Sequence, residues 1–336
     1  NRIWDMPNAN YITEGQFENS EELDSAISES SIWCIHRFYP GFRLLIEKHL
    51  SSTLIVVQTW GPDYLKYFPN QTQFLGEETL KQFPNQAQFL DQVTWGFKSW
   101  ATWKCIHPRA LYRNWYWSKI RQRELKLLQS VDAVMFAAPQ EATKARNALK
   151  INVFEERVIY GPPESFAPCR QKEGIRIQIG HCSDLSMNHL DALAAFSEHT
   201  HIRGVLLPIS YGTGKIEYVE SISQFANKLF PGRVEILTEF LSLDEYHQKC
   251  SKYNVLVLAN IRQQALGNLI IAVEQGRHIV VHQRGILAEF CKSLGLKFTT
   301  LDQVSELTLD TLISETEAEE NYSKLASFWN KETNNK

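Results

Sequence analysis

IRIQIG at residues 175–180 opens the part of the sequence that decides the fold. The run is apolar and rich in β-branched residues, and its final glycine allows the chain to leave the strand sharply. Further runs of this kind follow at residues 203–210, 233–238, 254–260 and 278–282, and helical patterns separate them. Strands and helices that alternate at this spacing predict a doubly wound, mostly parallel α/β sheet.

The first half of the chain predicts a second α/β unit. SIWCIHRF (31–38), STLIVVQTWG (52–61) and VDAVMFAA (131–138) predict strands, and GFRLLIEKHL (41–50) predicts an amphipathic helix between the first two. A length of 336 residues also exceeds what one hydrophobic core usually organises.

We expect the domain boundary in the proline-rich stretch before Gly174, where periodicity is lost. The expected parts are an N-terminal, acceptor-side Rossmann-like domain over 1–165, a C-terminal nucleotide-binding domain over 166–310, and a helix and tail over 311–336.

Composition excludes several classes of protein. A formal charge of −3 argues against a dedicated nucleic-acid binder. The six cysteines contain no CxxC pair, which predicts reduced thiols in a cytosolic protein and no structural zinc site. No apolar run has the length of a membrane span, and the start shows no signal-peptide pattern.

Residues 95–126 are unusual because they hold five of the nine Trp and eight Lys or Arg against one acid, Glu124. Aromatic and basic side chains of this kind favour a membrane surface. The alternative is a core helix whose basic residues are solvated.

A short duplication precedes this segment. FPNQTQFL (68–75) recurs as FPNQAQFL (83–90), with a period of 15 residues. Two copies are too few for a solenoid. They indicate a duplicated surface insertion or, as the alternative, a dedicated docking element.

Candidate ligand-binding residues follow from the rule that open α/β sheets bind ligands outside the carboxyl ends of their strands. The first loop that this rule selects is GHCSDLSMNH (180–189). Its Ser183, Asp184 and Ser186 suit the cap of a helix starting near Met187, or phosphate binding at that helix N-terminus.

Two further loops carry weaker signals. PISYGTGK (208–215) contains Tyr211 and a glycine-containing turn, and Lys215 is long enough to reach a phosphate. A Walker loop is excluded, because Ile216 stands where Ser or Thr would hold magnesium. His282, after the last strand, is expected to be structural.

ANIRQQALGN (259–268) carries the strongest signal. Arg262 is a fixed cation, Gln263 and Gln264 can bind a hydroxyl or amide, and Gly267-Asn268 open a helix. A cation beside a helix N-terminus is what diphosphate binding requires.

In the N-terminal half, Asp63 follows a central strand in QTWGPDYLKYF (58–68), and His36 ends the strand before it. Both are therefore candidates for the interdomain site.

From Ile177 to about Phe298 the chain resembles the bacterial 4-acetamido-4,6-dideoxygalactose transferases of enterobacterial common antigen synthesis. The matching stretches are IGHCSDLSMNHLDAL, LLPISYG with EYVESI, LSLDEYHQKC and IRQQALGNLIIAVEQG. WGPDY (60–64) is similar to a WGAD stretch of that family, and SIWCIHRFYP aligns with the strand before it.

The resemblance implies a GT-B fold, in which two Rossmann-like domains face a central cleft. It implies a nucleoside-diphosphate-sugar donor, dTDP-linked in that family, no cofactor and no obligatory metal. It further implies a polyprenyl-diphosphate-linked or other glycan acceptor in surface polysaccharide synthesis at the inner face of the membrane. The donor-site positions that it carries over are Gly180, Ser183, Asp184, Asn188, Tyr211, Arg262, Gln263, Gln264, Gly267 and Glu274.

The chain departs from the family at positions where sugar and diphosphate are expected to bind. The second small residue of the first loop shifts towards Cys182-Ser183, the glycine after RQQ becomes Ala265, and the Thr that follows becomes Asn268. The exact donor therefore stays open.

For the mechanism, we expect Arg262 and the amides around Gly267-Asn268 to stabilise the leaving diphosphate, with Lys215 as a weaker candidate. Glu274 would bind the ribose or sugar. The family product implies retention, which requires no dedicated protein base, whereas inversion would use Asp63 or His36. Arg262→Ala is expected to leave the fold intact.

Two other functions stay open. A sugar-nucleotide 2-epimerase shares the two-domain layout but needs carboxylates for proton abstraction, and the sequence places few at the expected site. A non-catalytic, membrane-associated sugar-nucleotide-binding protein is the second alternative.

Overall fold

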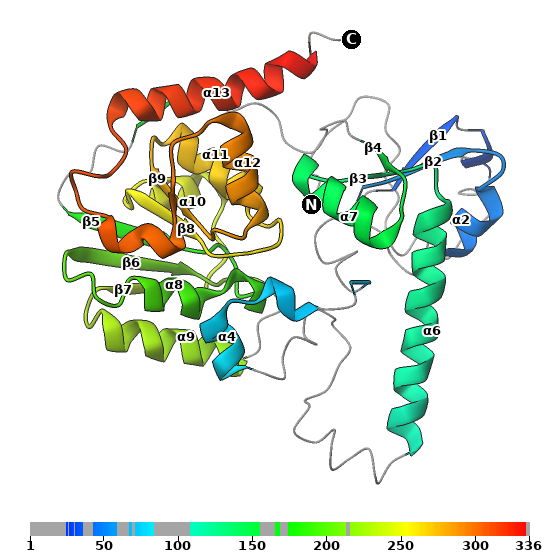
Figure 1. Ribbon diagram of the computed structural model, residues 1–336, viewed down its shortest axis with the longest axis horizontal. Helices are drawn as coiled ribbons and strands as arrows, with labels where there is room; N and C mark the ends of the chain where they lie inside the picture. Colours follow the sequence, from blue (N-terminus) through cyan, green and yellow to red (C-terminus); the bar gives the residue numbers. More distant parts are fainter. Residues whose placement is uncertain are drawn as a thin grey trace.

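The computed structural model describes residues 25, 27–29, 31–35, 43–58, 67–68, 71–83, 108–154, 165–168, 174–212 and 216–333. Within these ranges the chain forms two parallel sheets flanked by helices, which Figure 1 shows as two lobes.

The first sheet belongs to the N-terminal half and has the order β1-β2-β3-β4, with parallel pairing throughout its described strands. Its strands are β1 (Ile32–Ile35), β2 (Leu54–Gln58), β3 (Ala133–Met135) and β4 (Val153–Phe154). The helices α2 (Arg43–His49), α6 (Pro108–Ser130) and α7 (Pro139–Leu149) bury apolar side chains against it, among them Ile46, Leu128 and Ala145. The three strands and the helix predicted over 41–50 are confirmed.

The second sheet has the order β10-β9-β8-β5-β6-β7, and all its pairs are parallel. Its strands are β5 (Ile175–Ile179), β6 (Ile202–Pro208), β7 (Val234–Leu237), β8 (Val255–Leu258), β9 (His278–Val281) and β10 (Thr299–Thr300). The order reverses between β5 and β8, which is the topological switch point at which doubly wound sheets bind nucleotides.

Helices cover both faces of this sheet, as the sequence predicts. One face carries α8 (His189–Ala195), α9 (Ile216–Leu229) and the 3-10 helix η6 (Leu301–Glu306). The other carries α11 (Leu266–Glu274), α12 (Ile286–Leu294) and α13 (Glu315–Thr333). The helix α10 (Leu243–Cys250) precedes β8, and α12 is an element that sequence reasoning did not predict.

One element of the N-terminal half lies on the other lobe. The 3-10 helix η3 (Gln71–Phe74) leads into α4 (Glu77–Gln82), which packs against α8 and lies beside it in Figure 1. The predicted boundary near residue 165 falls between β4 and β5, the last strand of one sheet and the first of the other.

The unusual basic segment is in part a core helix. The C-terminal part of α6 buries Leu127 and Leu128, whereas Lys119, Arg123 and Lys126 are exposed. Residues 95–107, with three of the tryptophans, lie outside the described residues. Among the residues that the structure describes, no helix is long and apolar enough to cross a membrane.

The four cysteines within the described ranges are all free thiols, as predicted. Cys34 is exposed, and Cys182, Cys250 and Cys291 are buried.

Candidate functional site

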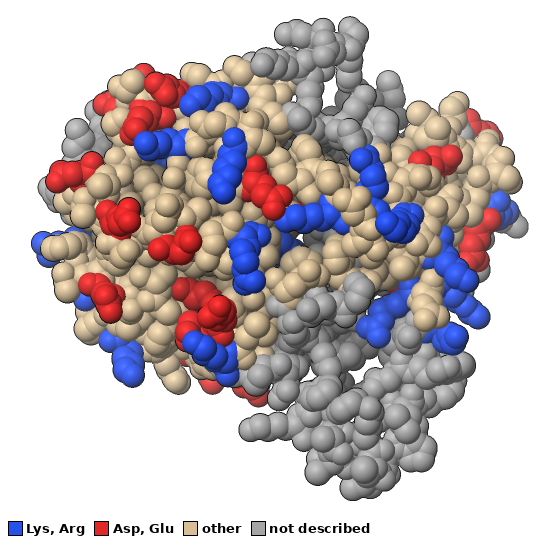
Figure 2. All heavy atoms as spheres, viewed as in Figure 1, with Lys and Arg blue, Asp and Glu red and all other residues tan. Residues whose placement is uncertain are grey.

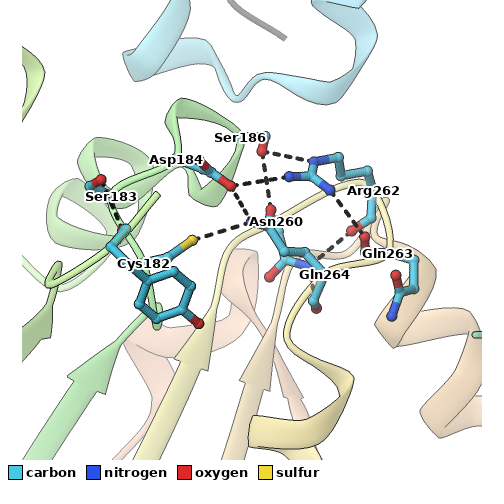
Figure 3. Close-up of polar contacts among 9 residues, drawn as sticks. Cys182, Ser183, Asp184, Ser186, Asn260, Arg262, Gln263 and Gln264 are labelled. Atoms are coloured by element: carbon cyan, nitrogen blue, oxygen red, sulfur yellow. Dashed lines mark hydrogen bonds and ion pairs between the residues drawn. The ribbon is translucent and has the colours of Figure 1, made fainter. Parts of the chain in front are cut away.

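The loops that follow β5 and β8 meet at the switch point of the second sheet. The β5 loop continues through the 3-10 turn η5 (Leu185–Met187), and the β8 loop leads from Ala259 into α11. Figure 3 shows their polar side chains pointing towards one another.

Arg262 of the β8 loop reaches across to the β5 loop. Its Nε donates to Ser186 Oγ at 2.8 Å, and its Nη2 forms an ion pair with Asp184 Oδ2 at 3.4 Å. Its Nη1 donates to the carbonyl of Gln263 at 3.4 Å. Only 3% of the Arg262 surface is exposed. The short bond therefore fixes Nε of the guanidinium, whereas Nη1 and Nη2 make longer and weaker contacts.

Gln264 makes a second bridge between the two loops. Its Nε2 donates to Asp184 Oδ2 at 2.8 Å and to Cys182 Sγ at 3.3 Å, and its Oε1 accepts from Ser186 Oγ at 3.1 Å. Within the β8 loop, Asn260 Nδ2 donates to the carbonyls of Arg262 and Gln264 at 2.9 and 3.1 Å. Strand-end reasoning thus brought Asp184, Arg262 and Gln264 together correctly.

The charges around Arg262 come from both halves of the chain. Burial lowers the pKa of Arg262, whereas Asp184, Cys182 and Glu141 raise it. Glu141, in the first turn of α7, is itself buried, and burial raises its pKa well above the usual value while Arg262 and Lys144 oppose the shift. The start of α7 therefore belongs to the surroundings of the site, which sequence reasoning missed.

The expected helix cap in the β5 loop is wrong. The N-cap residues of η5 and α8 are Asp184 and Asn188, and neither side chain makes a capping hydrogen bond. Asp184 instead accepts from Arg262 and Gln264. These polar residues connect loops, and α8 begins at His189, two residues later than expected.

The β6 loop is fastened to the β5 loop through Ser183. Its backbone N–H and its Oγ both donate to the carbonyl of Tyr211, at 2.7 and 3.0 Å. Gly212 has φ of +120°, and a Cβ there would lie 2.9 Å from Ser183 N and Oγ, so this approach requires glycine.

An aromatic surface follows β6 and β7. The Tyr211 side chain is 47% exposed, and its ring centroid lies 5.8 Å from that of His181 and 6.1 Å from that of Phe240. Phe240 is 77% exposed. Sequence reasoning missed Phe240, although the strand-end rule applied to the predicted strand at 233–238 would have found it.

Two histidines of the β5 loop are buried and uncharged at neutral pH. Burial lowers the pKa of His181 to about 4 and that of His189 to about 3. His189 Nδ1 lies 2.9 Å from the Tyr218 hydroxyl. A Cβ at Gly180, where φ is +70°, would lie 2.7 Å from His189 Nε2, so this glycine allows the ring to pack under the loop.

The N-terminus of α11 has no side-chain cap. Its N-cap residue, Ala265, has φ of +66°, the left-handed conformation that favours glycine. Gly267 and Asn268 lie in the first turn, as expected, and Asn268 Oδ1 accepts from the Tyr246 hydroxyl at 2.6 Å. That hydroxyl in turn accepts from Gln178 Nε2 at 2.9 Å.

Three expected site residues have other surroundings. Asn188 is fully buried, and its amide is bonded to Phe74, Gly76 and Ala259, so direct donor binding by Asn188 is corrected to a structural role. Glu274 is the last residue of α11, a rise of about 12 Å from the start of that helix, and its expected contact with the donor stays a prediction. Gln263 is buried beside Arg262.

The remaining candidates His36, Asp63 and Lys215 lie outside the described residues. His282 accepts at Nδ1 from the backbone N–H of Arg284 at 3.1 Å, in line with the expected structural role. No group of three His, Cys, Asp or Glu that could hold a metal ion occurs within the described ranges.

Solved structures with a similar arrangement show the fold to which the chain belongs. The chain is similar to an α,α-trehalose-phosphate synthase (UDP-forming) from Burkholderia vietnamiensis, with 9% identity, a TM-score of 0.56 and coverage of 95% of this chain and 74% of that one. It is similar to a sucrose-phosphate synthase from Thermosynechococcus elongatus, with 12% identity, a TM-score of 0.52 and coverage of 96% and 74%. A third similar structure, trehalose-6-phosphate from E. coli bound with UDP-2-fluoro glucose, has 10% identity, a TM-score of 0.52 and coverage of 96% and 76%.

The fold is that of the GT-B glycosyltransferases, as the resemblance implied. A sequence model of the family described as 4-alpha-L-fucosyltransferase glycosyl transferase group 56 matches residues 113–320, more than half of the chain. The chain therefore belongs to the glycosyl transferase group 56 family and is a glycosyltransferase. No curated protein sequence matches it significantly.

Proposed function

We propose that the protein transfers a deoxy or acetamido sugar from a nucleoside-diphosphate donor, dTDP-linked, to a polyprenyl-diphosphate-linked or other glycan acceptor in bacterial surface polysaccharide synthesis. The family description, a fucosyltransferase, supports a deoxysugar. The observation that carries the proposal is that the β8 loop at the switch point holds Arg262 and leads directly into α11, whose start has no side-chain cap.

The diphosphate would bind where these two features meet. The first amides of α11 point out of the helix and favour an anion. The Nη1 and Nη2 atoms of Arg262 make contacts of 3.4 Å, and a charge-assisted bond to phosphate is about 2.8 Å long and stronger. Donor binding would therefore move Nη1 and Nη2 of Arg262 from their present partners to the phosphate, while the bond from Nε to Ser186 is kept.

Stabilising the leaving diphosphate is the catalytic device that we propose. Charge develops on the diphosphate as the bond to the sugar breaks, and Arg262 with the amides of Gly267 and Asn268 would stabilise that charge. Lys215 would add a second cation. We propose a retaining reaction without an obligatory metal, and Asp63 or His36 as the base if the reaction inverts.

The nucleotide base would lie on the aromatic surface of Tyr211 and Phe240. Both rings follow strands at the same edge of the sheet as the diphosphate loops, and both are exposed. Bases stack on aromatic rings with a free energy of about 1 to 3 kcal/mol each.

The acceptor side would lie at the inner face of the membrane, held through residues 95–126. Lys119, Arg123 and Lys126 are exposed on α6, and Figure 2 shows basic side chains gathered on the lobe from which α6 projects. Anionic headgroups attract each such side chain by about 1 kcal/mol.

A turnover experiment tests the function. The protein would be incubated with dTDP- and UDP-linked sugars, with and without a polyprenyl-diphosphate-linked acceptor. We expect release of dTDP that depends on the acceptor. Epimerisation without acceptor would indicate a 2-epimerase, and binding without turnover a non-catalytic protein; either result would refute the proposal.

A further inference from the structure

A segment of the N-terminal half, residues 74–83, is fastened to the C-terminal lobe beside the candidate donor loops. We call it the strap. Leu75 and Phe83 at its two ends are buried in an apolar cluster with residues of the other lobe, and the Phe83 ring lies edge-on to Tyr218 with centroids 5.4 Å apart. The rest of that cluster consists of Leu185, Leu190, Ile209 and Ile222.

Asp191 of α8 caps the helix inside the strap. Its Oδ1 accepts from the Glu78 N–H at 2.9 Å, and its Oδ2 accepts from the Thr79 N–H at 3.0 Å and from Thr79 Oγ1 at 2.5 Å. The first amides of α4 have no partner within their own helix, so a cap supplied by another lobe orients the strap and holds it there.

Asn188 connects the strap to the donor loops. Its Oδ1 accepts from the Gly76 N–H at 2.9 Å, and its Nδ2 donates to the carbonyls of Phe74 at 3.3 Å and Ala259 at 2.9 Å. Ala259 precedes Asn260, whose amide holds the carbonyl of Arg262 at 2.9 Å. A continuous set of bonds therefore runs from the strap to Arg262.

We propose that the strap is a working part of the donor site, and that Asn188 and Asp191 are positioning residues through which it holds the β5 and β8 loops and thereby Arg262. The inference rests on the proposed function only in so far as these loops bind the donor. The strap joins the two copies of the sequence repeat, since it begins with the last two residues of the first copy and ends with the first residue of the second.

Gly76, which directly follows the first copy of the repeat, is needed for the docking of the strap. A Cβ on Gly76 would overlap the carboxylate of Asp191, so the close approach of α4 to α8 requires glycine. Fifteen residues later, Asp91 stands directly after the second copy. A side chain there, and a negative one, is incompatible with docking against Asp191. The residues that follow the second copy therefore could not dock on α8 in the same way.

Hydrogen exchange of the full chain tests the proposal without reference to turnover. Gly76→Asp introduces the residue that follows the second copy, and Glu77→Ala, at the exposed first residue of α4, is the matched control. We expect amides at 181–188 and 260–264 to exchange at least about tenfold faster in Gly76→Asp and unchanged in Glu77→Ala. Fast exchange in the strap alone, with both loops as protected as in the wild type, would overturn the proposal.

Two gentler changes keep the test decisive if Gly76→Asp does not fold. Asn188 has φ of 53°, so Asn188→Gly keeps the backbone conformation and removes the three bonds, and the same loops should exchange faster. In the pair Gly76→Ala and Asp191→Ala, removing the carboxylate makes room for the new methyl group. In the double variant these loops should then exchange no faster than in the single variant that exchanges faster. Strictly additive effects would contradict the contact.

Binding of dTDP, measured by calorimetry, connects the strap to the site. We expect Asn188→Gly to weaken dTDP binding about tenfold, the loss of roughly one hydrogen bond to a charged group. Leu149→Ala, which destabilises the N-terminal core far from the strap, should leave dTDP affinity unchanged. Equal affinity in Asn188→Gly and the wild type would overturn the positioning role. If the wild type itself does not bind dTDP, the proposed donor fails, and hydrogen exchange still decides the strap.

Discussion

Arg262 carries the charge on which the proposed mechanism depends, and the structure changes what its removal is expected to do. Sequence reasoning treated Arg262 as a fixed cation and expected Arg262→Ala to leave the fold intact. Its side chain is instead buried, paired with Asp184 and near Glu141. Truncation would leave those carboxyls without their cation, at a cost of about 3 kcal/mol.

Arg262→Lys is therefore the better test. Lysine keeps the charge but loses the bond from Nε to Ser186 Oγ and the planar fork that can bind two phosphate oxygens. We expect turnover to fall about 100-fold or more, while the free energy of unfolding, measured in urea, falls less than in Arg262→Ala. Turnover within about twofold of the wild type would exclude Arg262 from catalysis.

Ala265 adopts a backbone conformation that favours glycine. A glycine of the resembled family becomes alanine here, and the structure gives that alanine φ of +66°. The left-handed conformation costs an L-residue about 1 to 2 kcal/mol, and glycine avoids this cost. Glycine also gives the unfolded chain more conformational entropy, which offsets part of the gain in stability.

We expect Ala265→Gly to raise the free energy of unfolding by about 0.5 to 1 kcal/mol. Gly295→Ala is the matched reverse change, because Gly295 has φ of +65° and open space around its Cα. It should destabilise by about the same amount in the same urea titration. A destabilising Ala265→Gly would show that the methyl group makes contacts that outweigh the strain.

At the scale of elements, the β5 loop should make stability depend on pH. The pKa of His181 is lowered to about 4 by burial, and that of His189 to about 3. The unfolded chain therefore binds protons that the folded chain does not, below the usual histidine pKa of about 6.5. Stability from these residues is present above that pH and is lost as the pH falls towards 4.

We expect the free energy of unfolding to fall between pH 6.5 and 4 by about 1.4 kcal/mol per pH unit for each of these histidines. His181→Gln should make this slope shallower by about that amount. The same slope in the variant and the wild type would show that His181 is solvated when protonated.

The turn after β7 tests the proposed base surface. Phe240→Ala removes an exposed ring that buries little in the free protein, so stability should hardly change. We expect dTDP binding to weaken by about 1 to 3 kcal/mol, the range for base stacking. Leu309→Ala, another exposed apolar residue in a different part of the lobe, is the control. Unchanged affinity in Phe240→Ala would place the base elsewhere.

Local patterns predicted these elements well where the signal is itself local. Apolar β-branched runs and helical periodicity predicted both sheets, and the strand-end rule predicted that Asp184 and Arg262 meet. The helix at 286–294 was not predicted, although Gly285 and Gly295 stand at its two ends. The start of α8 was misplaced because polar residues suited for a cap instead bind the neighbouring loop.

For the whole molecule, what sequence reasoning missed are contacts between distant parts of the chain. No periodicity shows that α4 docks on α8 through Asp191, or that Glu141 of α7 lies near Arg262. Glu274 was assigned to the site because it matched a family position, yet the direction of α11 carries it away from the loops. Local patterns were enough to predict the two α/β units, whereas the surroundings of the site depend on how distant parts of the chain meet.

The central claim is that the β5 and β8 loops of this glycosyltransferase bind the diphosphate of its donor. Thermal unfolding in the presence of dTDP tests it most directly, because a ligand at 100 times its Kd stabilises by about 2.7 kcal/mol. We predict that dTDP raises the unfolding temperature of the wild type and that this rise is lost in Arg262→Lys. A rise of equal size in Arg262→Lys, or none in the wild type, would contradict the claim.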